Sequence, residues 1–431
     1  MVSGDFSLPA VTINFLFMKI LILTALYPPL GANGQDDRCR QVVDALSKRG
    51  HQLQVLTSNH RVPSMGFPGQ KGVYRHLQLH DSEGIECRLG VSYAATYEQE
   101  LIQARMLYNR LDHFQPDVVY VWNMQGVSKS LLFNLQNQDT PIAYDLHSNW
   151  LSPHLFELDP WFTWWQRNQS LRSKCYQFYL KLSGLARRRL RYFPVGTVTD
   201  LDISNGYVCS ESLRADLVAA GVAQAATLPV IYPALNTEAL LSKISYHPAR
   251  KFMWAGRLNA SKAPGIALRA VEILKGRGIY VSLDFYGMGM PSERKAMRNL
   301  IDRAGLSDSV RMLMIRPGEL VSKYPEYDAL LFTSCCNDPF PITPLEAMLS
   351  GLPSILARDG GIEEIAKDGE IALLYDAGDA EALADAMVRM MNIEDGGSAM
   401  AKKCMERLQV QHSLDTFVPQ IEAFLSASIQ S

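Results

Sequence analysis

The feature that most constrains the fold is a repeated alternation of short apolar runs with helix-length segments. "KILILTALYPP", beginning at Lys19, is a continuous apolar run, as expected of a parallel strand covered on both faces. The helical segment "DDRCRQVVDALSKRG" follows, and then come the runs "QLQVLTS", "DVVYVWN", "PIAYDLH" and "GYVCS". Strands that alternate with helices in this way predict a doubly wound α/β domain.

The same alternation begins again after "VIYPALNTEAL", which we interpret as a linker. Its strands are "KFMWAGRL", "VSLDFYG", "VRMLMI", "ALLFTSC", "PSILA" and "IALLY". A chain of 431 residues also exceeds what one hydrophobic core usually fills. We therefore expect an α/β protein of two Rossmann-like doubly wound domains, residues 18–234 and 235–410, facing each other across a central cleft.

The two ends of the chain need separate interpretations. The last segment, "LDTFVPQIEAFLSASI", has apolar residues at helical spacing, so residues 411–431 are expected to form a helix that crosses back to the N-terminal domain. The first segment is apolar enough to suggest a signal peptide, but no basic region precedes it and Pro9 and Lys19 interrupt it. We expect residues 1–17 to be a disordered extension or an artefact of the start codon.

Composition excludes some classes of partner. Lys and Arg number 42 against 44 Asp and Glu, which does not favour nucleic acid as a partner. The seven cysteines lack the spacing of metal ligands, so we expect reduced thiols, no metal site and a cytoplasmic protein.

Residues 150–200 break the alternation with a mixture of aromatic and basic residues, "DPWFTWWQRNQ" and "SGLARRRLRYF". Four arginines are fewer than the usual polybasic signal and the helical period is poor, which favours a solvated helix face with aromatics packed under an insertion. The alternative is a weak peripheral contact of this segment with the inner face of an anionic membrane.

Candidate binding residues follow the strands, because open α/β sheets bind ligands at the carboxyl ends of their strands. In "WAGRLNASKAPG", Arg257 and Lys262 lie between a strand and a helix start. A cation there is disfavoured by the helix dipole unless an anion lies beside it. The pair predicts a diphosphate clamp, whereas Lys262 alone would be compatible with a surface lysine.

The stretch "CNDPFPITPLEAM" follows another strand and supports two hypotheses. In the first, Thr343 is an N-cap, Pro344 is the first helical residue and Glu346 closes a capping box with Thr343. That hypothesis explains Glu346 but leaves Asp338, Phe340 and the rigid prolines unexplained.

The second hypothesis is a ligand site. Backbone amides of Ile342 and Thr343 would bind a phosphate at the helix N-terminus, while the carboxylates would accept hydrogen bonds from hydroxyl groups. Ligands that carry both hydroxyls and phosphates include nucleotide sugars.

Four segments together resemble family 4 of the retaining glycosyltransferases, which belong to the glycosyl transferases group 1 and have the GT-B fold. They are "GRLNASK", "DPFPITPLEAM", "SGLPSILARDGGIEEIAKDG" and the opening "YPPLGANG" with "VVDALSKRGHQLQVLTS". The resemblance extends from about residue 18 to the end, and between residues 60 and 210 it is one of rhythm only.

The resemblance implies a hexosyltransferase-type enzyme that moves a sugar from a nucleoside diphosphate sugar to an acceptor hydroxyl. Configuration would be retained, without a metal and with no cofactor besides the donor substrate. The acceptor would be a glycan, a lipid-linked molecule or a small molecule, in cytoplasmic synthesis of cell-surface polysaccharide or glycoconjugates.

The resemblance also implies roles for single residues. Arg257 and Lys262 would neutralise the leaving diphosphate, Glu346 would bind the ribose hydroxyls, and Asp338 would stand near the donor sugar at the position of the family's first glutamate. His147 in "YDLHSN" matches the family's histidine at the cleft wall. The remaining donor-binding positions are Gly34, Gly256, Phe340, Ile342 and Thr343.

Departures from the family pattern leave alternatives open. Asp338 is one methylene shorter than glutamate, Pro341 stands where glycine is usual, and Ala372 replaces a glycine in "DGEIALL". A nucleotide-sugar epimerase on the same fold and a non-catalytic sugar-nucleotide-binding subunit are the alternative functions. For His147, the alternative is a hydrogen bond to a loop carbonyl.

Overall fold

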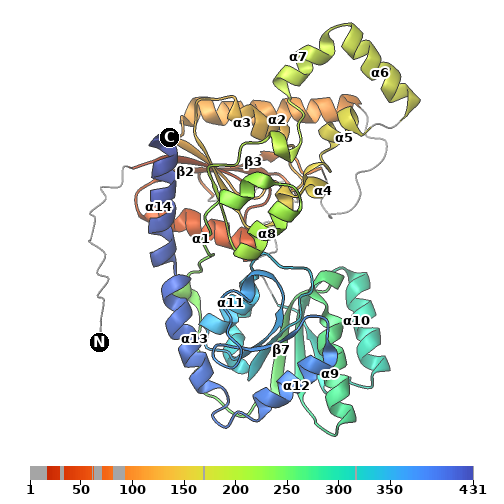
Figure 1. The fold of residues 1–431 in the computed structure, drawn as a ribbon, viewed down its shortest axis with the longest axis vertical. Helices are drawn as coiled ribbons and strands as arrows, with labels where there is room; N and C mark the ends of the chain where they lie inside the picture. The colour runs from red at the N-terminus through yellow and green to blue at the C-terminus, as the bar shows by residue number, and fades with distance from the viewer. Residues whose placement is uncertain are drawn as a thin grey trace.

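The computed structural model describes residues 17–29, 34–60, 62, 70–80, 93–167, 170–315 and 318–430. Residues 1–16, for which a disordered extension is expected, lie outside this part. Two lobes lie one above the other, each built around its own parallel sheet (Figure 1). The predicted α/β architecture of two doubly wound domains is therefore confirmed.

Each sheet has six strands, and every pairing is parallel. The first sheet has the order β3-β2-β1-β4-β5-β6 and the second the order β12-β11-β10-β7-β8-β9. The strands are β1 Lys19–Leu23, β2 Gln52–Ser58, β3 Val73–Leu77, β4 Val118–Val121, β5 Ile142–Leu146, β6 Gly206–Val208, β7 Lys251–Arg257, β8 Ser282–Met288, β9 Val310–Leu313, β10 Ala329–Phe332, β11 Ser354–Arg358 and β12 Leu373–Asp376.

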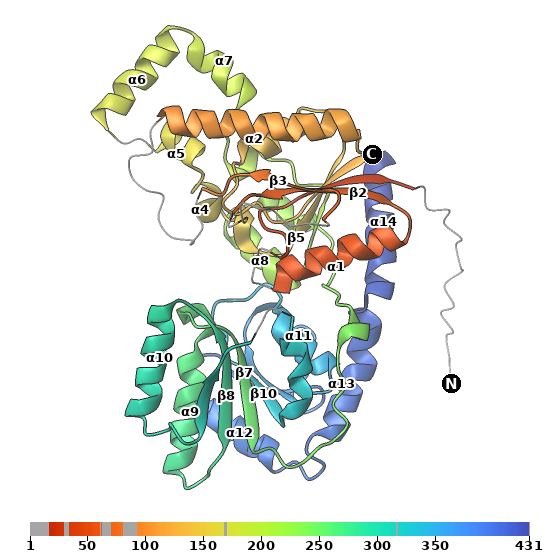
Figure 2. The ribbon, with the colours of Figure 1, turned by 180° about the vertical axis from the view of Figure 1, so that it is seen from behind.

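Helices cover both faces of each sheet (Figure 2). They are α1 Gly34–Lys48, α2 Tyr93–Phe114, α3 Ser130–Gln136, α4 Pro153–Phe156, α5 Pro160–Gln166, α6 Leu171–Leu182, α7 Leu185–Tyr192, α8 Glu211–Ala219, α9 Pro264–Gly276, α10 Pro291–Arg303, α11 Ile342–Leu349, α12 Ala380–Met391, α13 Ser398–Gln411 and α14 Leu414–Gln430. None of these helices combines the length and the apolar character that spanning a bilayer requires.

The apolar runs are continuous because both faces of each strand are buried. Ile20 and Ile22 of β1 pack with residues of α1 and α14, whereas Leu21 and Leu23 pack with residues of α2 and α3. In the second sheet Phe252 of β7 packs with residues of α9 and α12. Successive side chains point to opposite faces of a strand, so a strand between two helical layers needs no polar position.

The C-terminal helix joins the two domains. α13 lies along the second domain and α14 continues along the first (Figure 2). Phe417, Ile421 and Leu425 of α14 are buried in the same cluster as Ile20 of β1. The predicted crossing helix is thus present, and it supplies part of the core of the first domain.

One strand was not predicted. β3, "VYRHL", is the edge of the first sheet, and β2 is its one partner among the described strands. Its burial is partial and its residues are mixed, since an edge strand that is not covered on both faces needs no apolar run.

Candidate active site

The loop after β10 is fastened to the turn after β7. Lys262 ends the short 3-10 helix Ala260–Lys262, which is capped by Asn259, whose Oδ1 accepts the Lys262 amide at 3.2 Å. The Thr333 hydroxyl donates to the Lys262 carbonyl at 2.8 Å and accepts from the Trp254 indole at 2.8 Å. These bonds hold the carboxyl ends of two neighbouring strands together.

As a result, Lys262 and Asp338 form an ion pair between Nζ and Oδ2. The side chains are 20% and 10% exposed, so the pair is largely shielded from water but open on one side. Arg257, the last residue of β7, is exposed and makes no ion pair with any residue that the structure describes. The two predicted clamp cations therefore differ: Lys262 is fixed by a carboxylate and Arg257 points to solvent.

The segment that follows β11 holds Asp338 in place. The Asp359 carboxylate accepts the amides of Asn337 at 2.7 Å and Asp338 at 3.3 Å. A Cβ on Gly360 would lie 2.0 Å from the Asp338 carbonyl oxygen, and one on Gly361 would lie 2.1 Å from that of Pro339. Only glycine allows this close approach, so the Gly360-Gly361 pair fixes the loop that carries Asp338.

The predicted capping box is wrong. α11 begins at Ile342 with Pro341 at the N-cap position, and no side chain caps it. Pro341 has extended φ and ψ of -75° and 128°, so the helical conformation begins directly after it, and Thr343 lies inside the first turn. The Glu346 carboxylate instead accepts the hydroxyl of Tyr324 at 2.8 Å.

Glu346 of α11 lies near α1 of the first domain. Burial raises its pKa to about 7, the Tyr324 hydroxyl opposes the shift, and the charge of Asp37 on α1 adds to it. Asp37 belongs to the first domain, and α1 and α11 lie close to each other where the two domains meet (Figure 2). The amides of Ile342 and Thr343, in the first turn of α11, lack an intrahelical partner and provide donors four and five residues after Asp338.

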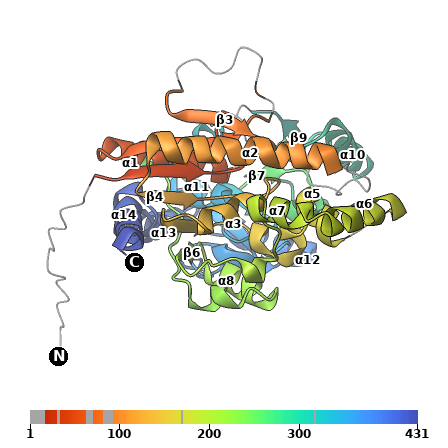
Figure 3. The same cartoon turned by 90° about the horizontal axis from the view of Figure 1, so that it is seen from above.

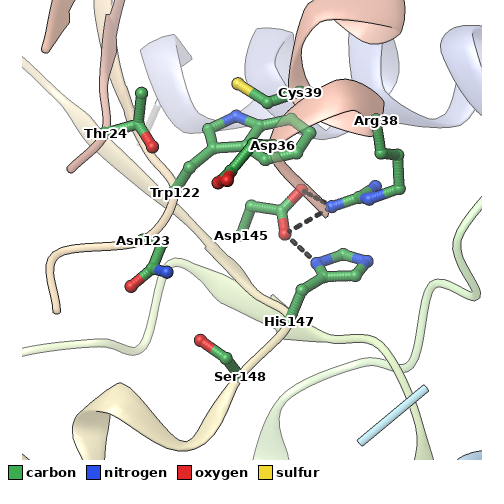
Figure 4. Close-up of a pocket in the computed structure, with 9 residues that line it drawn as sticks. All are labelled: Thr24, Asp36, Arg38, Cys39, Trp122, Asn123, Asp145, His147 and Ser148. Atoms are coloured by element: carbon green, nitrogen blue, oxygen red, sulfur yellow. Dashed lines mark hydrogen bonds and ion pairs between the residues drawn. The ribbon is translucent and has the colours of Figure 1, made fainter. Parts of the chain in front are cut away.

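The first domain contributes a pocket where β1, β4 and β5 end (Figure 4). Its lining residues are Thr24, Asp36, Arg38, Cys39, Trp122, Asn123, Asp145, His147 and Ser148. At its wall, Arg38 and Asp145 form a fully buried ion pair, with Arg38 Nη2 at 3.1 Å from each carboxylate oxygen. The hydroxyls of Tyr120, at 3.0 Å, and of Tyr207 also donate to Asp145.

His147 is placed by this pair. Its Nδ1 contacts Asp145 Oδ1, and its ring stacks on Trp122 at 6.2 Å between centroids and an interplanar angle of 13°. Burial lowers the pKa of His147 well below its usual value, and the Arg38 charge lowers it further. The Asp145 carboxylate is therefore one partner of His147, and with Nδ1 carrying the proton beside it, Nε2 is the basic nitrogen of the neutral ring.

Two residues central to this pocket, Arg38 and Asp145, were not predicted. The signal that could have found them is Asp145 itself, a charged residue inside the apolar run "PIAYDLH". A buried charge requires a partner, which the sequence does not identify.

The remaining predicted positions are placed as follows. Gly34 is the first residue of α1, and residues 30–33 before it lie outside the described part. Gly256 lies near the end of β7 beside Arg257. Phe340 is 2% exposed, and its ring packs near Tyr232 and His412, at 5.8 and 5.7 Å. Its side chain therefore supports the domain junction rather than the cleft.

One group of described residues has the geometry of a metal site. His80, Glu100 and Asp159 offer ligand atoms within 4.8 Å of one another. Asp159, however, caps α5 and accepts the Lys129 amide at 2.6 Å, and Glu100 is bonded by Ser128 and Ser130. The Lys129 ammonium lies close enough to affect the pKa of Glu100, so the group is accounted for as a buried polar network.

Two Rossmann-like domains that face each other around a charged cleft define the GT-B class of fold. Sucrose-phosphate synthase from Thermosynechococcus elongatus matches over 95% of this chain and 98% of its own, with 16% identity and a TM-score of 0.68. Anabaena Alr3699/HepE in complex with UDP-glucose matches over 95% and 100%, with 18% identity and a TM-score of 0.65. At these identities the likeness shows the fold.

Residues 242–407 match the family described as Glycosyl transferases group 1. D-inositol 3-phosphate glycosyltransferase from Corynebacterium urealyticum is 34% identical over 160 residues, 36% of this chain and 38% of the relative. Amylovoran biosynthesis glycosyltransferase AmsK from Erwinia amylovora is 28% identical over 150 residues, 33% and 36% of the two chains. The matches thus span less than half the length of these relatives.

Proposed function

We propose that this protein transfers a sugar from a nucleoside diphosphate sugar to an acceptor hydroxyl, with retained configuration and without a metal. The observation that carries the proposal is the Lys262–Asp338 pair, which joins the segments after β7 and β10 and whose Asp338 lies four residues before the start of α11. A cation and free helix amides at one place form a site for a diphosphate.

The two domains would contribute different groups to the reaction. On the second domain, Lys262, Arg257 and the α11 amides would stabilise the charge that develops on the leaving diphosphate. Asp338 and Glu346 would accept hydrogen bonds from the donor's hydroxyls. On the first domain, neutral His147 would face the reacting groups from the pocket wall.

Two comparisons support a nucleotide sugar as the donor. A solved structure of the same fold, HepE, holds UDP-glucose, and residues 242–407 match a family of glycosyltransferases. We extend the proposal to a hexose donor, to family 4, to a cytoplasmic location, and to a glycan, lipid-linked or small-molecule acceptor in glycoconjugate synthesis.

The experiment is incubation with a panel of UDP-, GDP- and ADP-sugars, with and without acceptors, in the presence of EDTA. We expect release of the nucleoside diphosphate from one donor, and an anomeric configuration by NMR that equals that of the donor. Isomerised sugar nucleotide in the absence of acceptor would instead indicate an epimerase. A nucleotide that raises the Tm while no donor turns over would indicate a non-catalytic binding subunit.

A further inference from the structure

A helical hairpin made of α6 and α7 projects from the first domain on the side away from the second domain (Figures 1 and 3). It is attached through a small buried cluster in which Leu180 of α6 and Ala186 of α7 pack with Trp164 of α5. Most other residues of α6 are exposed. The hairpin therefore presents a helix face that the rest of the described chain does not cover.

This outward face is apolar. Leu171, Cys175, Phe178 and Leu182 follow one another at steps of four, three and four residues, so they share one face of α6. Leu171 is 81% exposed, Phe178 67% and Leu182 78%. The apolar stripe of a surface helix ordinarily faces the core, whereas this stripe lies opposite the buried Leu180 and faces out.

The surroundings of the stripe carry charge of one sign. No Asp or Glu occurs between residues 160 and 199. The exposed cations of the hairpin are Arg172, Lys174, Lys181, Arg187, Arg188 and Arg191. None of them forms an ion pair with a described residue.

The cations of α6 occupy the positions expected for a helix that lies at a lipid–water interface. At about 3.6 residues per turn, Arg172 lies on one flank of the stripe, and Lys174 and Lys181 lie on the other. Long cationic side chains in such flanking positions can keep their charges among headgroups while their stems cover apolar surface. α7 adds three exposed arginines beside the end of the stripe.

Most aromatic residues of the neighbouring helix α5 are buried, unlike those of α6. Trp161, Phe162 and Trp164 of α5 are buried, and Arg189 lies over the rings of Tyr93 and Tyr97 at 5.0 and 4.5 Å. These are the aromatics that the sequence pattern places under an insertion. The apolar residues of α6 are not among them, so packing against the residues that the structure describes does not explain the outward stripe.

We propose that the hairpin of residues 171–192 docks on an anionic lipid surface. The stripe of α6 lies in the interface, and the flanking cations contact headgroup phosphates. Because α6 is only 12 residues long, it lies in the plane of the membrane and does not cross it. The one-sided charge on both flanks favours lipid over a protein partner, whose surface would ordinarily carry both signs.

The test is co-sedimentation of the full chain with vesicles of phosphatidylcholine, with and without phosphatidylglycerol. We expect binding to the vesicles that contain phosphatidylglycerol, little binding to phosphatidylcholine alone, and weakening by salt. Absence of binding to the anionic vesicles would overturn the proposal. So would equal binding to both compositions.

Two variants separate the electrostatic contribution to vesicle binding from the apolar one. Replacing Arg187, Arg188 and Arg191 together by Gln should weaken binding about 10²-fold, at about one kcal/mol per cation. Replacing Phe178 and Leu182 by Ser should weaken it about tenfold or more, because two apolar side chains no longer enter the interface. These side chains are exposed, so neither variant should change the Tm.

Ile244→Ser and Lys295→Gln, exposed positions of the second domain, serve as matched controls and should bind as wild type. Wild-type binding by both hairpin variants would contradict docking through this surface. A dimer in light scattering that the Phe178 and Leu182 substitutions convert to a monomer, with vesicle binding unchanged, would show that a second copy covers the stripe. None of these outcomes depends on glycosyl transfer, so the proposed function is tested separately.

Discussion

The carboxyl group of Glu346 makes the stability of the protein depend on pH. Burial and the Asp37 charge raise its pKa to about 7 in the folded protein, from an ordinary value of about 4.3. Because the folded pKa lies above the unfolded one, folding takes up a proton between these two values. The stability that Glu346 contributes is therefore fully present below about pH 4 and is lost as the pH rises through about 7.

The Glu346→Gln variant tests the direction of this pH dependence of stability. Gln keeps the shape and can accept the Tyr324 hydroxyl, but it does not titrate. We expect the Tm of the variant, relative to wild type, to rise between about pH 5 and about pH 8. A Tm difference that stays constant over this range would contradict the burial of an ionisable group at this position.

Asp338 combines two roles that a single substitution can separate. It forms an ion pair with Lys262, and it stands where the family resemblance places a carboxylate near the donor sugar. Asp338→Asn removes the charge with little change of shape. We expect nucleoside diphosphates to bind at least as tightly as to wild type, since Lys262 is released, while transfer slows on the order of 10²-fold.

Calorimetric titration and initial rates measure the two effects. Asp376→Asn, whose carboxylate is largely exposed, is the matched control and should leave both unchanged. Wild-type rates for Asp338→Asn would remove Asp338 from the donor site.

The Arg38–Asp145 pair ties α1 to β5 in the first domain. Both side chains are fully buried, so removing one charge leaves the other uncompensated. We expect Arg38→Met and Asp145→Asn each to cost about 3 to 5 kcal/mol of unfolding free energy, and the double variant to cost clearly less than the sum. Urea unfolding of the four proteins measures this coupling, and additive losses would show that the two side chains do not depend on each other.

Elements buried on both faces were predictable from sequence, and elements shaped by their surroundings were not. The strands with continuous apolar runs, such as β1 and β7, were identified, whereas the mixed edge strand β3 was missed. The start of α11 was predicted too late, because Thr343 followed by proline is a strong capping signal that Pro341 overrides.

The site could be predicted only in part, because its contacts join residues that lie far apart in the sequence. Arg257 and Lys262 were singled out because they follow one strand, but the contact of Lys262 with Asp338 joins residues 76 positions apart. That contact depends on β7 lying beside β10, which local periodicity does not specify. Arg38 and Asp145 were missed for the same reason.

Across the whole molecule, the domains are joined by polar contacts as well as by the linker and α14. The Glu364 carboxylate, in the second domain, accepts the amides of Glu211 at 3.0 Å and Ser212 at 2.7 Å at the start of α8 in the first domain. Ser210 donates to the Pro339 carbonyl at 2.6 Å. These bonds connect the α8 terminus to the loop that carries Asp338.

Glu364→Ala should therefore loosen the domain arrangement. We expect a larger radius of gyration by small-angle X-ray scattering and a loss of about 1 to 3 kcal/mol in stability, because the two amide donors lose their acceptor. Glu363→Ala is the matched control, because Glu363 is exposed and pairs only with Arg358 at 3.1 Å among described residues. Equal scattering curves for Glu364→Ala and wild type would show that these contacts do not hold the domains together.

The central claim is that the cleft binds a nucleoside diphosphate through Lys262. Calorimetric titration of UDP, GDP and ADP into wild type, Lys262→Ala and the surface control Lys295→Ala tests it most directly. We predict that one diphosphate binds wild type and the control alike, and binds Lys262→Ala about 10- to 100-fold more weakly, as expected for a lost charge-assisted bond. Failure of all three to bind wild type, or equal affinity for Lys262→Ala, would contradict the claim.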